Sequence, residues 1–361
     1  MTSRRRSSRI VFFAFARVAL MSVLVIDSSA KIMTTRASLI AEPPFFKTPE
    51  RGPGSEKQEK YMTDEADKMN GWGWPRAGTG VMPITVVAVE QSFPGEQRIV
   101  DDPLAYRMLP RRARLFVRLM RIGWLRNRII GLSEKNEPGI WGDFLCRKRY
   151  IDDKLAAACS RIDAVVNLGA GFDTRAWRLS AISQLPVWEV DQRMNIVAKA
   201  KRLKEIFGSV PSRVRLVEID FDTEDLTAVL SSKGYLPGGR TFFVWEAVSQ
   251  YLTEQGVRKT FNFLAQAPAG SCLAMSYVRR DFLDGKNLYG WKAGYKRFVT
   301  GGMWHFGMQP EEAPGFLSEF GWDLVEDVGY DRLALRYPAL THRGLAATPV
   351  ERMVYAEKQG S

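Results

Sequence analysis

The segment Ala164–Arg178 constrains this chain more than any other, because it has the pattern of a buried strand, a glycine turn and a helix. Val165-Val166 is β-branched and apolar, as in a short buried strand. Gly169-Ala170-Gly171 then allows a tight turn in which the backbone can approach a ligand closely. A second apolar run, Val187–Val190, ends in Asp191, where the second strand of a βαβ unit places a carboxylate for ribose hydroxyls. We therefore predict a nucleoside-cofactor site at the centre of the chain.

The residues after the glycine turn favour S-adenosylmethionine over a dinucleotide. A dinucleotide fingerprint has a third glycine three residues further on, where a helix N-terminus faces a pyrophosphate. That position is Thr174 here, preceded by Asp173, whose carboxylate would repel a pyrophosphate and suits a cationic ligand. S-adenosylmethionine carries a sulfonium and an ammonium and no phosphate. An NAD-type oxidoreductase stays open as an alternative, as does a strand-turn-helix unit without a ligand.

The sequence NLGAGFDTRAWRL followed by VWEVDQ resembles the leucine carboxyl methyltransferase-like group of class I methyltransferases, in particular its bacterial polyketide-type O-methyltransferase branch. The resemblance runs from about Val81 to the end of the chain. One departure is Glu246-Ala247-Val248-Ser249, where many relatives carry Glu-Gly-Leu. The other segments that resemble the family, in its order, are IVDDPLAYRMLP (99–110), RKRYIDD (147–153), VRLVEIDFD (214–222) and FFVWEAVSQYL (242–252).

The resemblance implies an α/β fold of the Rossmann-like class I methyltransferase type. We expect a mostly parallel seven-stranded sheet with helices on both faces and a final antiparallel strand. The expected organisation is a targeting-like or mis-started leader (1–32), a flexible linker (33–80), a helical cap (81–160) and an S-adenosylmethionine-binding domain (161–361) with a lid insertion (279–309).

The resemblance also implies which residues bind the cofactor. A guanidinium suits the methionine carboxylate because it donates paired hydrogen bonds. A solvated helix face is the alternative for the two candidate arginines, since Asp152 and Asp153 could be their ion partners. The implied set is Arg147 or else Arg149 for the methionine carboxylate, Gly169 and Gly171 for the methionine moiety, Asp191 for the ribose, Asp220 and Phe221 for the adenine, and Glu246 near the ammonium, with Asp173 beside the turn.

The implied reaction is transfer of the methyl group from the sulfonium to an oxygen, either a carboxylate or a hydroxyl, of a small molecule or a protein terminus. The sequence does not name this acceptor. A carboxylate acceptor needs no base, whereas a hydroxyl acceptor does. His305, in an aromatic-rich insertion, is the candidate base and Tyr251 is its rival. Simple packing of His305 between Trp304 and Phe306 is the alternative.

The cysteine and histidine content bears on the compartment and on metals. The chain has three cysteines, an odd number, which indicates reduced thiols without a disulfide framework. It has two histidines, so we expect no multi-histidine metal site. The reduced cysteines favour a cytoplasmic protein. However, Arg4-Arg5-Arg6 before the apolar run Ile10–Ile26 has the layout of a targeting segment, so organelle targeting or membrane association stays open if this leader belongs to the mature protein.

Positive charge is concentrated between Arg111 and Arg128, where seven arginines and no acid occur in a chain of net charge +12. We predict one basic amphipathic helix there. Its open interpretations are a solvated cap helix, a contact with an anionic membrane, a contact with an acidic substrate and a contact with RNA. A protein of this fold that binds RNA or membrane without turnover is the corresponding alternative function, and the oligomeric state is left open. The side predicted to be buried consists of Leu115, Phe116, Leu119, Met120 and Ile122.

Overall fold

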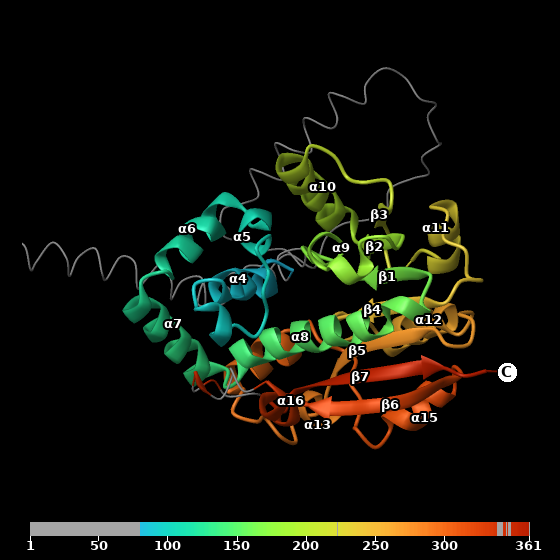
Figure 1. Ribbon diagram of the computed structural model, residues 1–361. Helices are drawn as coiled ribbons and strands as arrows, with labels where there is room; N and C mark the ends of the chain where they lie inside the picture. The colour runs from blue at the N-terminus through green and yellow to red at the C-terminus, as the bar shows by residue number, and fades with distance from the viewer. Residues whose placement is uncertain (1–79, 222, 338–341, 344, 346–347, 361) are drawn as a thin grey trace, which may run out of the picture. The chain divides into compact units, whose positions relative to one another are not determined.

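Seven strands form one sheet in the order β3-β2-β1-β4-β5-β7-β6 in the computed structural model of the protein (Figure 1). Strands β1 to β5 pair in parallel, whereas β7 is antiparallel to both β5 and β6. This confirms the predicted mostly parallel sheet with a final antiparallel strand. The strands are β1 (Ala164–Leu168), β2 (Val187–Asp191), β3 (Val214–Glu218), β4 (Thr241–Trp245), β5 (Cys272–Val278), β6 (Trp322–Gly329) and β7 (Glu351–Lys358).

The structure describes residues 80–221, 223–337, 342–343, 345 and 348–360. These residues belong to one compact unit, 79–361, which contains both the helices before β1 and the sheet. The leader predicted at 1–32 and all but the last residue of the linker predicted at 33–80 lie outside the described residues.

Helices cover both faces of this sheet. The α-helices are α4 (Val81–Glu90), α5 (Ala105–Met108), α6 (Arg111–Leu119), α7 (Gly123–Asn136), α8 (Ile140–Ala158), α9 (Arg175–Arg178), α10 (Arg193–Phe207), α11 (Leu226–Ser232), α12 (Glu254–Leu264), α13 (Arg280–Leu283), α14 (Lys292–Gly294), α15 (Ala313–Ser318) and α16 (Tyr330–Arg336). Single-turn 3-10 helices lie at Gly95–Gln97, Cys159–Arg161, Ser180–Ile182 and Ser249–Tyr251, and a π-helix at Tyr295–Thr300. No helix among these described segments combines the length and apolar character needed to cross a membrane.

Alternating side chains along the strands build two cores, one on each face of the sheet. In β1, Val165 belongs to the core that includes residues of α4, α8 and α10, and Val166 belongs to the core that includes residues of α11, α12 and α15. Phe242 and Phe243 of β4 divide in the same way. This alternation follows from the period of two in a strand, and apolar side chains on both faces are typical of a parallel sheet covered by helices.

The basic segment at 111–128 forms two helices, so the prediction of one continuous helix was wrong. Helix α6 ends at Leu119, Ile122 has extended backbone angles, and α7 begins at Gly123. The break changes which residues face inward, because the helical phase of α6 is not continued in α7. Val117 and Met120 are buried, whereas Leu115 and Ile122 are 56% and 45% exposed, against the prediction that both are buried.

The insertion after β5 begins at Arg279, directly at the carboxyl end of that strand. It contains α13, α14 and the π-helix, and Arg279 pairs with Met308 in an isolated bridge where the insertion ends. The aromatic side chains of the insertion pack on one another. The Phe298 and Trp304 rings are stacked with centroids 4.4 Å apart, and Phe282 contacts Trp291 edge to face. These rings belong to the same hydrophobic core as residues of α4 and α8, so the insertion packs as part of the domain.

A buried ion pair joins β2 to the helix that follows it. The Lys199 Nζ of α10 lies 2.6 Å from Glu189 Oε2, and the two side chains are 0% and 1% exposed. The Trp177 ring lies against the same ammonium, 5.4 Å from its centroid. Burial is the main reason why the pKa of Glu189 rises to about 7, although Lys199 opposes the rise.

We predict that Glu189→Gln removes part of the pH dependence of stability. A carboxyl whose pKa is raised in the folded state binds a proton there that the unfolded state has released, between about pH 4.5 and pH 7. The free energy of unfolding of the wild type should therefore fall as the pH rises through this window, by up to about 1.4 kcal/mol per pH unit from this group. Glutamine resembles the protonated acid and should flatten the curve in urea unfolding at pH 5, 6, 7 and 8. The exposed control Glu218→Gln should keep the wild-type profile, and an unchanged profile in Glu189→Gln would contradict the prediction.

Candidate active site

The turn after β1 contains two glycines with left-handed backbone angles. Gly169 has φ of +76° and Gly171 has φ of +45°. A Cβ atom on Gly169 would lie 2.2 Å from Val248 Cγ2, so no larger residue fits without a shift. The left-handed backbone therefore favours glycine at both predicted positions, and at Gly169 the close approach of Val248 also excludes a larger residue.

Asp191 at the end of β2 holds this turn. Its Oδ2 accepts a hydrogen bond from the Gly171 N–H at 2.5 Å. Its Oδ1 accepts from the Gln192 N–H at 2.7 Å and from Asn195 Nδ2 at 2.8 Å. The structure therefore brings two predicted site residues, Gly171 and Asp191, into direct contact.

The predicted adenine residues follow β3. Asp220 is exposed, and its N–H donates to Glu224 Oε2 at 2.7 Å. Phe221 is half-buried and packs against the core on the α11 and α12 face. Since β3 lies next to β2 in the parallel sheet, with Asp191 in register with Glu218, these residues follow the strand adjacent to Asp191.

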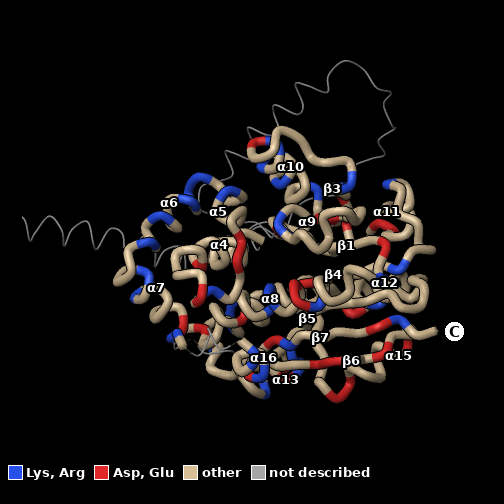
Figure 2. Tube along the Cα trace, in the orientation of Figure 1, with Lys and Arg blue, Asp and Glu red and all other residues tan. Residues whose placement is uncertain are grey.

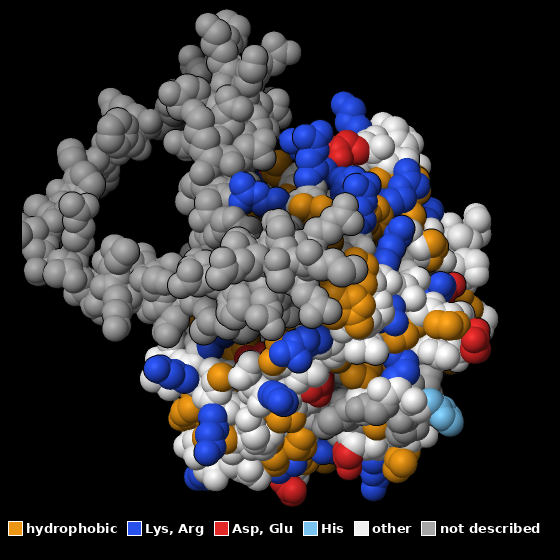
Figure 3. Space-filling model, turned by 90° about the vertical axis from the view of Figure 1, so that its left-hand side faces the viewer, with side chains coloured by type: hydrophobic (Ala, Val, Ile, Leu, Met, Phe, Trp, Pro, Cys, Tyr) orange, Lys and Arg blue, Asp and Glu red, His pale blue; other side chains and the backbone are white. Residues whose placement is uncertain are grey.

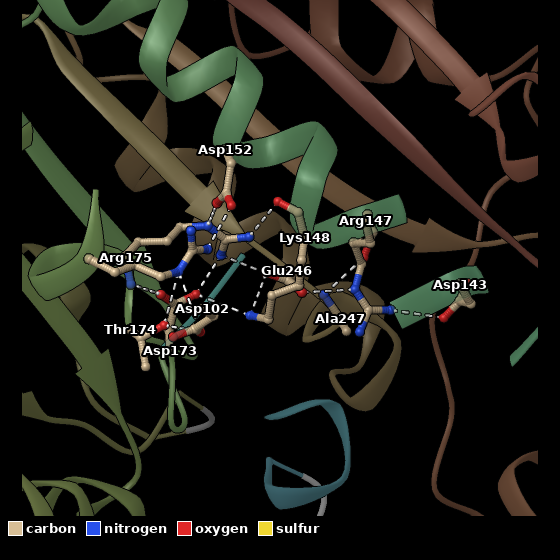
Figure 4. Close-up of polar contacts among 12 residues, drawn as sticks. Asp102, Asp143, Arg147, Lys148, Asp152, Asp173, Thr174, Arg175, Glu246 and Ala247 are labelled. Carbon is tan, nitrogen blue, oxygen red and sulfur yellow. Dashed lines mark hydrogen bonds and ion pairs between the residues drawn. The ribbon is translucent and has the colours of Figure 1, made fainter. Parts of the chain in front are cut away.

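Glu246, directly after β4, lies between three cations (Figure 4). Its Oε1 accepts from Arg147 Nε at 3.0 Å. Its Oε2 accepts from Lys148 Nζ at 3.2 Å and from Arg175 Nη1 at 2.7 Å. One carboxylate thus connects β4 with helix α8 and with the segment that follows the glycine turn.

Further carboxylates surround the same cations. Arg147 Nη1 also donates to Asp143 Oδ2 at 3.2 Å and to Glu351 Oε2 at 2.8 Å. Asp173 accepts from Lys148 at 3.3 Å, from the Arg175 N–H at 2.7 Å and from the Arg175 guanidinium. We call the whole group the ion cluster; its members are Arg147, Lys148, Arg175 and Arg178 with Asp102, Asp143, Asp152, Asp173, Glu246 and Glu351.

The electrostatics of the ion cluster favour ionised groups. Burial alone would raise the pKa of the Asp173 carboxyl, but Arg175 and Lys148 outweigh it and hold that pKa well below its usual range. The pKa of Glu246 is lowered against burial in the same way by Lys148, Arg175 and Arg147. Asp102 is the exception, because burial raises its pKa although Arg178 opposes the rise. The ion cluster as a whole contains four cations and six carboxyl groups. The cluster is therefore suited to a ligand that brings positive charge.

The two arginines proposed for the methionine carboxylate lie on different sides of α8. Arg147 is 1% exposed and belongs to the ion cluster. Arg149 is exposed, donates to Asp153 Oδ1 at 2.8 Å and reaches the Ile99 carbonyl at 3.2 Å. The structure thus brings Arg147 together with Glu246 and Asp173, and leaves Arg149 outside the cluster.

The two candidate bases lie near each other. The Tyr251 and Trp304 rings meet edge to face with centroids 6.4 Å apart, and the His305 N–H donates to the Gln250 carbonyl at 2.7 Å. The His305 side chain is exposed, whereas Tyr251 is half-buried. Burial raises the pKa of Tyr251, so its hydroxyl keeps the proton at neutral pH.

Sequence reasoning missed several members of the ion cluster. Lys148 and Arg175 are close to predicted site residues in the sequence. However, Lys148 pairs with Asp173 and Arg175 pairs with Glu246, and each of these two pairs joins distant parts of the sequence. The only available signal was the charge of RKRYIDD and DTR, which is equally compatible with a solvated helix face. Within the described part of the chain, no group of His, Cys, Asp and Glu has the arrangement of a metal site.

Ala247, the departure from the family pattern, also has a left-handed backbone, with φ of +56°. Ser276 Oγ of β5 accepts from the Ala247 N–H at 2.9 Å and donates to Glu351, which also pairs with Arg147. The turn after β4 is thus attached to β5, to β7 and, through the ion cluster, to α8. Alanine therefore adopts a left-handed backbone conformation there, which glycine adopts at a lower steric cost.

Comparisons with known proteins agree with this geometry. The family model of leucine carboxyl methyltransferase matches residues 80–265, which are 186 of the 361 residues. A Streptomyces avermitilis protein provisionally named an S-adenosyl-L-methionine-dependent methyltransferase is 28% identical over 208 residues, 57% of this chain and 69% of that protein. A Mycobacterium ulcerans protein with the same provisional name is 35% identical over 122 residues, 33% of this chain and 40% of that protein. A solved DUF574 family protein from S. avermitilis is 18% identical, covers 64% of this chain and 90% of its own, and has a TM-score of 0.46.

The chain therefore belongs to the leucine carboxyl methyltransferase family, a family of S-adenosylmethionine-dependent methyltransferases. The predicted resemblance is confirmed, and so is the predicted class I methyltransferase fold.

We predict that Arg147→Gln and Arg149→Gln differ strongly in stability, although the two residues are neighbours on one helix. Removing Arg147 takes one buried cation away from the carboxylates Asp143, Glu246 and Glu351, and breaking such buried pairs costs about 3–5 kcal/mol. Arg149 forms an exposed pair, which contributes about 0–1 kcal/mol. Urea unfolding should reveal this difference, with Arg147→Lys as an intermediate case if Arg147→Gln does not fold. Equal losses for the two Gln variants would contradict the described cluster.

A second prediction concerns the backbone at Ala247. Ala247→Gly should raise the free energy of unfolding by up to about 1 kcal/mol, because it removes the steric penalty of a left-handed L-residue. Ala198, exposed within α10, is the matched control, since glycine in an ordinary helix costs about 0.5–1 kcal/mol. The two substitutions should therefore shift the thermal midpoint in opposite directions. A loss of stability in Ala247→Gly would show that the turn does not strain alanine.

Proposed function

We propose that this protein binds S-adenosylmethionine at the carboxyl ends of β1, β2 and β4 and transfers its methyl group to an oxygen of a small-molecule acceptor. The observation that carries the proposal is Asp191, a strand-end carboxylate in hydrogen-bond contact with the glycine turn. Family membership supports the cofactor, and the bound cofactor would supply an activated methyl group on a sulfonium.

The residues present fit this cofactor in charge, and the turn beside Asp191 exposes glycine backbone. Gly169 and Gly171 leave the backbone bare where a Cβ atom would meet a neighbour or strain the turn. The ion cluster has more carboxyl groups than cations, which complements a ligand whose sulfonium and ammonium outnumber its carboxylate. Asp191 would bind the ribose hydroxyls, Asp220 and Phe221 the adenine, and Glu246 and Asp173 the ammonium.

The geometry favours an anchoring role for Arg147. Its Nε and Nη1 already donate to Glu246, Asp143 and Glu351. A methionine carboxylate would therefore have to be bound by the remaining N–H groups of the guanidinium. We therefore propose that Arg147 mainly orients Glu246, and that Lys148, which contacts both Asp173 and Glu246, competes with it for the cofactor carboxylate.

The protein would promote methyl transfer by aligning the acceptor oxygen with the methyl group and by excluding water from the site. The leaving group needs no further activation. Tyr251 keeps its proton at neutral pH and would donate a hydrogen bond to the acceptor instead of acting as a base. A hydroxyl acceptor would then depend on His305. A carboxylate acceptor would need neither residue as a base.

The acceptor class can be tested with a cofactor labelled on its methyl group. The protein is incubated with small-molecule and protein fractions, and the labelled product is treated with mild alkali. A methyl ester releases labelled methanol under these conditions, whereas a methyl ether keeps its label. Labelling of small molecules at oxygen supports the proposal, and labelling only at nitrogen or carbon contradicts it.

We predict that Asp191→Asn weakens S-adenosylmethionine binding by about 10- to 100-fold, since hydrogen bonds to a charged group contribute about 1.5–3 kcal/mol. Asp163→Asn is the matched control, because Asp163 is exposed and precedes β1 at the opposite end of the strand. Isothermal titration calorimetry with S-adenosylmethionine, and with NAD as a comparison ligand, measures the effect. Unchanged affinity in a folded Asp191→Asn protein would exclude Asp191 as the ribose ligand.

A further inference from the structure

Helices α6 and α7 expose basic and large apolar side chains on the same faces. In α6, Leu115 is 56% exposed and lies three or four residues from Arg111, Arg112 and Arg118, all exposed. Residues at these spacings are neighbours on a helix surface. A leucine is thus surrounded by arginines on the outer side of α6.

Helix α7 repeats this mixture. Trp124, Arg128 and Leu132 follow one another at intervals of four residues, and all three are exposed, Trp124 to 61% and Leu132 to 39%. Ile122, between the two helices, is 45% exposed. We call the exposed residues Arg111, Arg112, Leu115, Arg118, Arg121, Ile122, Trp124, Arg128 and Leu132 the α6–α7 face.

The charge of the α6–α7 face has one sign. The sequence from 103 to 133 contains no Asp or Glu. The next acid, Glu134, is directed to the backbone, where it accepts from the Gly139 N–H at 2.6 Å and from the Trp141 N–H at 3.2 Å. Lys and Arg positions, coloured blue along the chain trace, recur through α6 and α7 in Figure 2, and Figure 3 shows blue and orange side chains interspersed on this side of the molecule.

Two other arginines of the segment, Arg114 and Arg126, are not part of the α6–α7 face and make contacts inside the protein. Arg114 Nε donates to the Leu109 carbonyl at 2.8 Å. Arg126 lies over the Phe93 ring, 3.9 Å from its centroid, and donates to the Ser92 carbonyl. Internal packing therefore accounts for Arg114 and Arg126. Arg121 also reaches the Tyr106 ring, 5.9 Å from its centroid, but like the rest of the α6–α7 face it is exposed.

We propose that the α6–α7 face binds the surface of an anionic lipid bilayer. Arginines pair with lipid phosphates, while leucine and tryptophan side chains enter the boundary between headgroups and acyl chains. RNA would use the same arginines through its phosphates but would gain little from Leu115 and Leu132. The mixture of cationic and aliphatic side chains therefore favours a bilayer.

The test is co-sedimentation of the full chain with vesicles of phosphatidylcholine containing phosphatidylglycerol, and with vesicles of phosphatidylcholine alone. The wild type should bind the anionic vesicles at least tenfold more tightly than the neutral ones. R111Q/R118Q/R128Q should weaken this binding at least tenfold, and L115S/L132S at least threefold. The control K233Q/R240Q/K286Q removes the same number of exposed charges elsewhere and should bind as the wild type does.

Unfolding curves and S-adenosylmethionine affinity should be nearly unchanged in all three variants, because these side chains are exposed or half-buried and lie outside the ion cluster. Three results would overturn the proposal. The first is wild-type vesicle binding in either the R111Q/R118Q/R128Q or the L115S/L132S variant. The second is an equal loss in the control variant. The third is tight binding to RNA, or self-association lost in L115S/L132S, without binding to anionic vesicles.

Discussion

The contacts of Glu246 with Arg147, Lys148 and Arg175 are the interaction on which the rest of the site depends. Glu246 directly follows β4, the first two cations belong to α8, and Arg175 follows the glycine turn after β1. The strand, the helix and the turn are therefore held together by one buried carboxylate. Asp191 adds the fourth element, because its bond to the Gly171 N–H fixes the end of β2 against the same turn. Through Glu351 and Ser276 the cluster also reaches β7 and β5.

Such an arrangement is not needed for stability alone. Replacing a buried ion network by well-packed apolar side chains is often neutral or stabilising, because burying charges is expensive. Fixed charges have a different advantage in a site that binds a charged ligand, since they are already oriented when the ligand arrives. The low pKa values of Asp173 and Glu246 keep both carboxylates ionised at neutral pH. These fixed charges support the proposed role of the cluster in binding the cofactor.

Much of the fold could be predicted from the sequence, because its signals are local. The apolar runs at 164–168 and 187–190 gave β1 and β2, and Asp191 and the two glycines of the turn came together as their spacing indicated. The ion cluster could not be predicted, since Arg175 and Glu246 pair across 71 positions of sequence. The break at Gly123 was also missed, because a helical projection of 111–128 assumes an uninterrupted helix. Buried Met120 and exposed Leu115 show that tertiary packing decided which side of the segment faces inward.

Helix α8 connects the α6–α7 face with the site. Glu134 of α7 accepts hydrogen bonds from Gly139 and Trp141 at the start of α8, so the end of α7 and the beginning of α8 are held together. Arg147 lies seven residues after Ile140, the first residue of α8. At 1.5 Å per residue, this is about 10 Å along a continuous helix. A surface bound at α6 and α7 would therefore orient α8 and, with it, the cations that hold Glu246. Attachment and methyl transfer would share one rigid element while using different side chains, which is why the two proposals can be tested separately in the same protein.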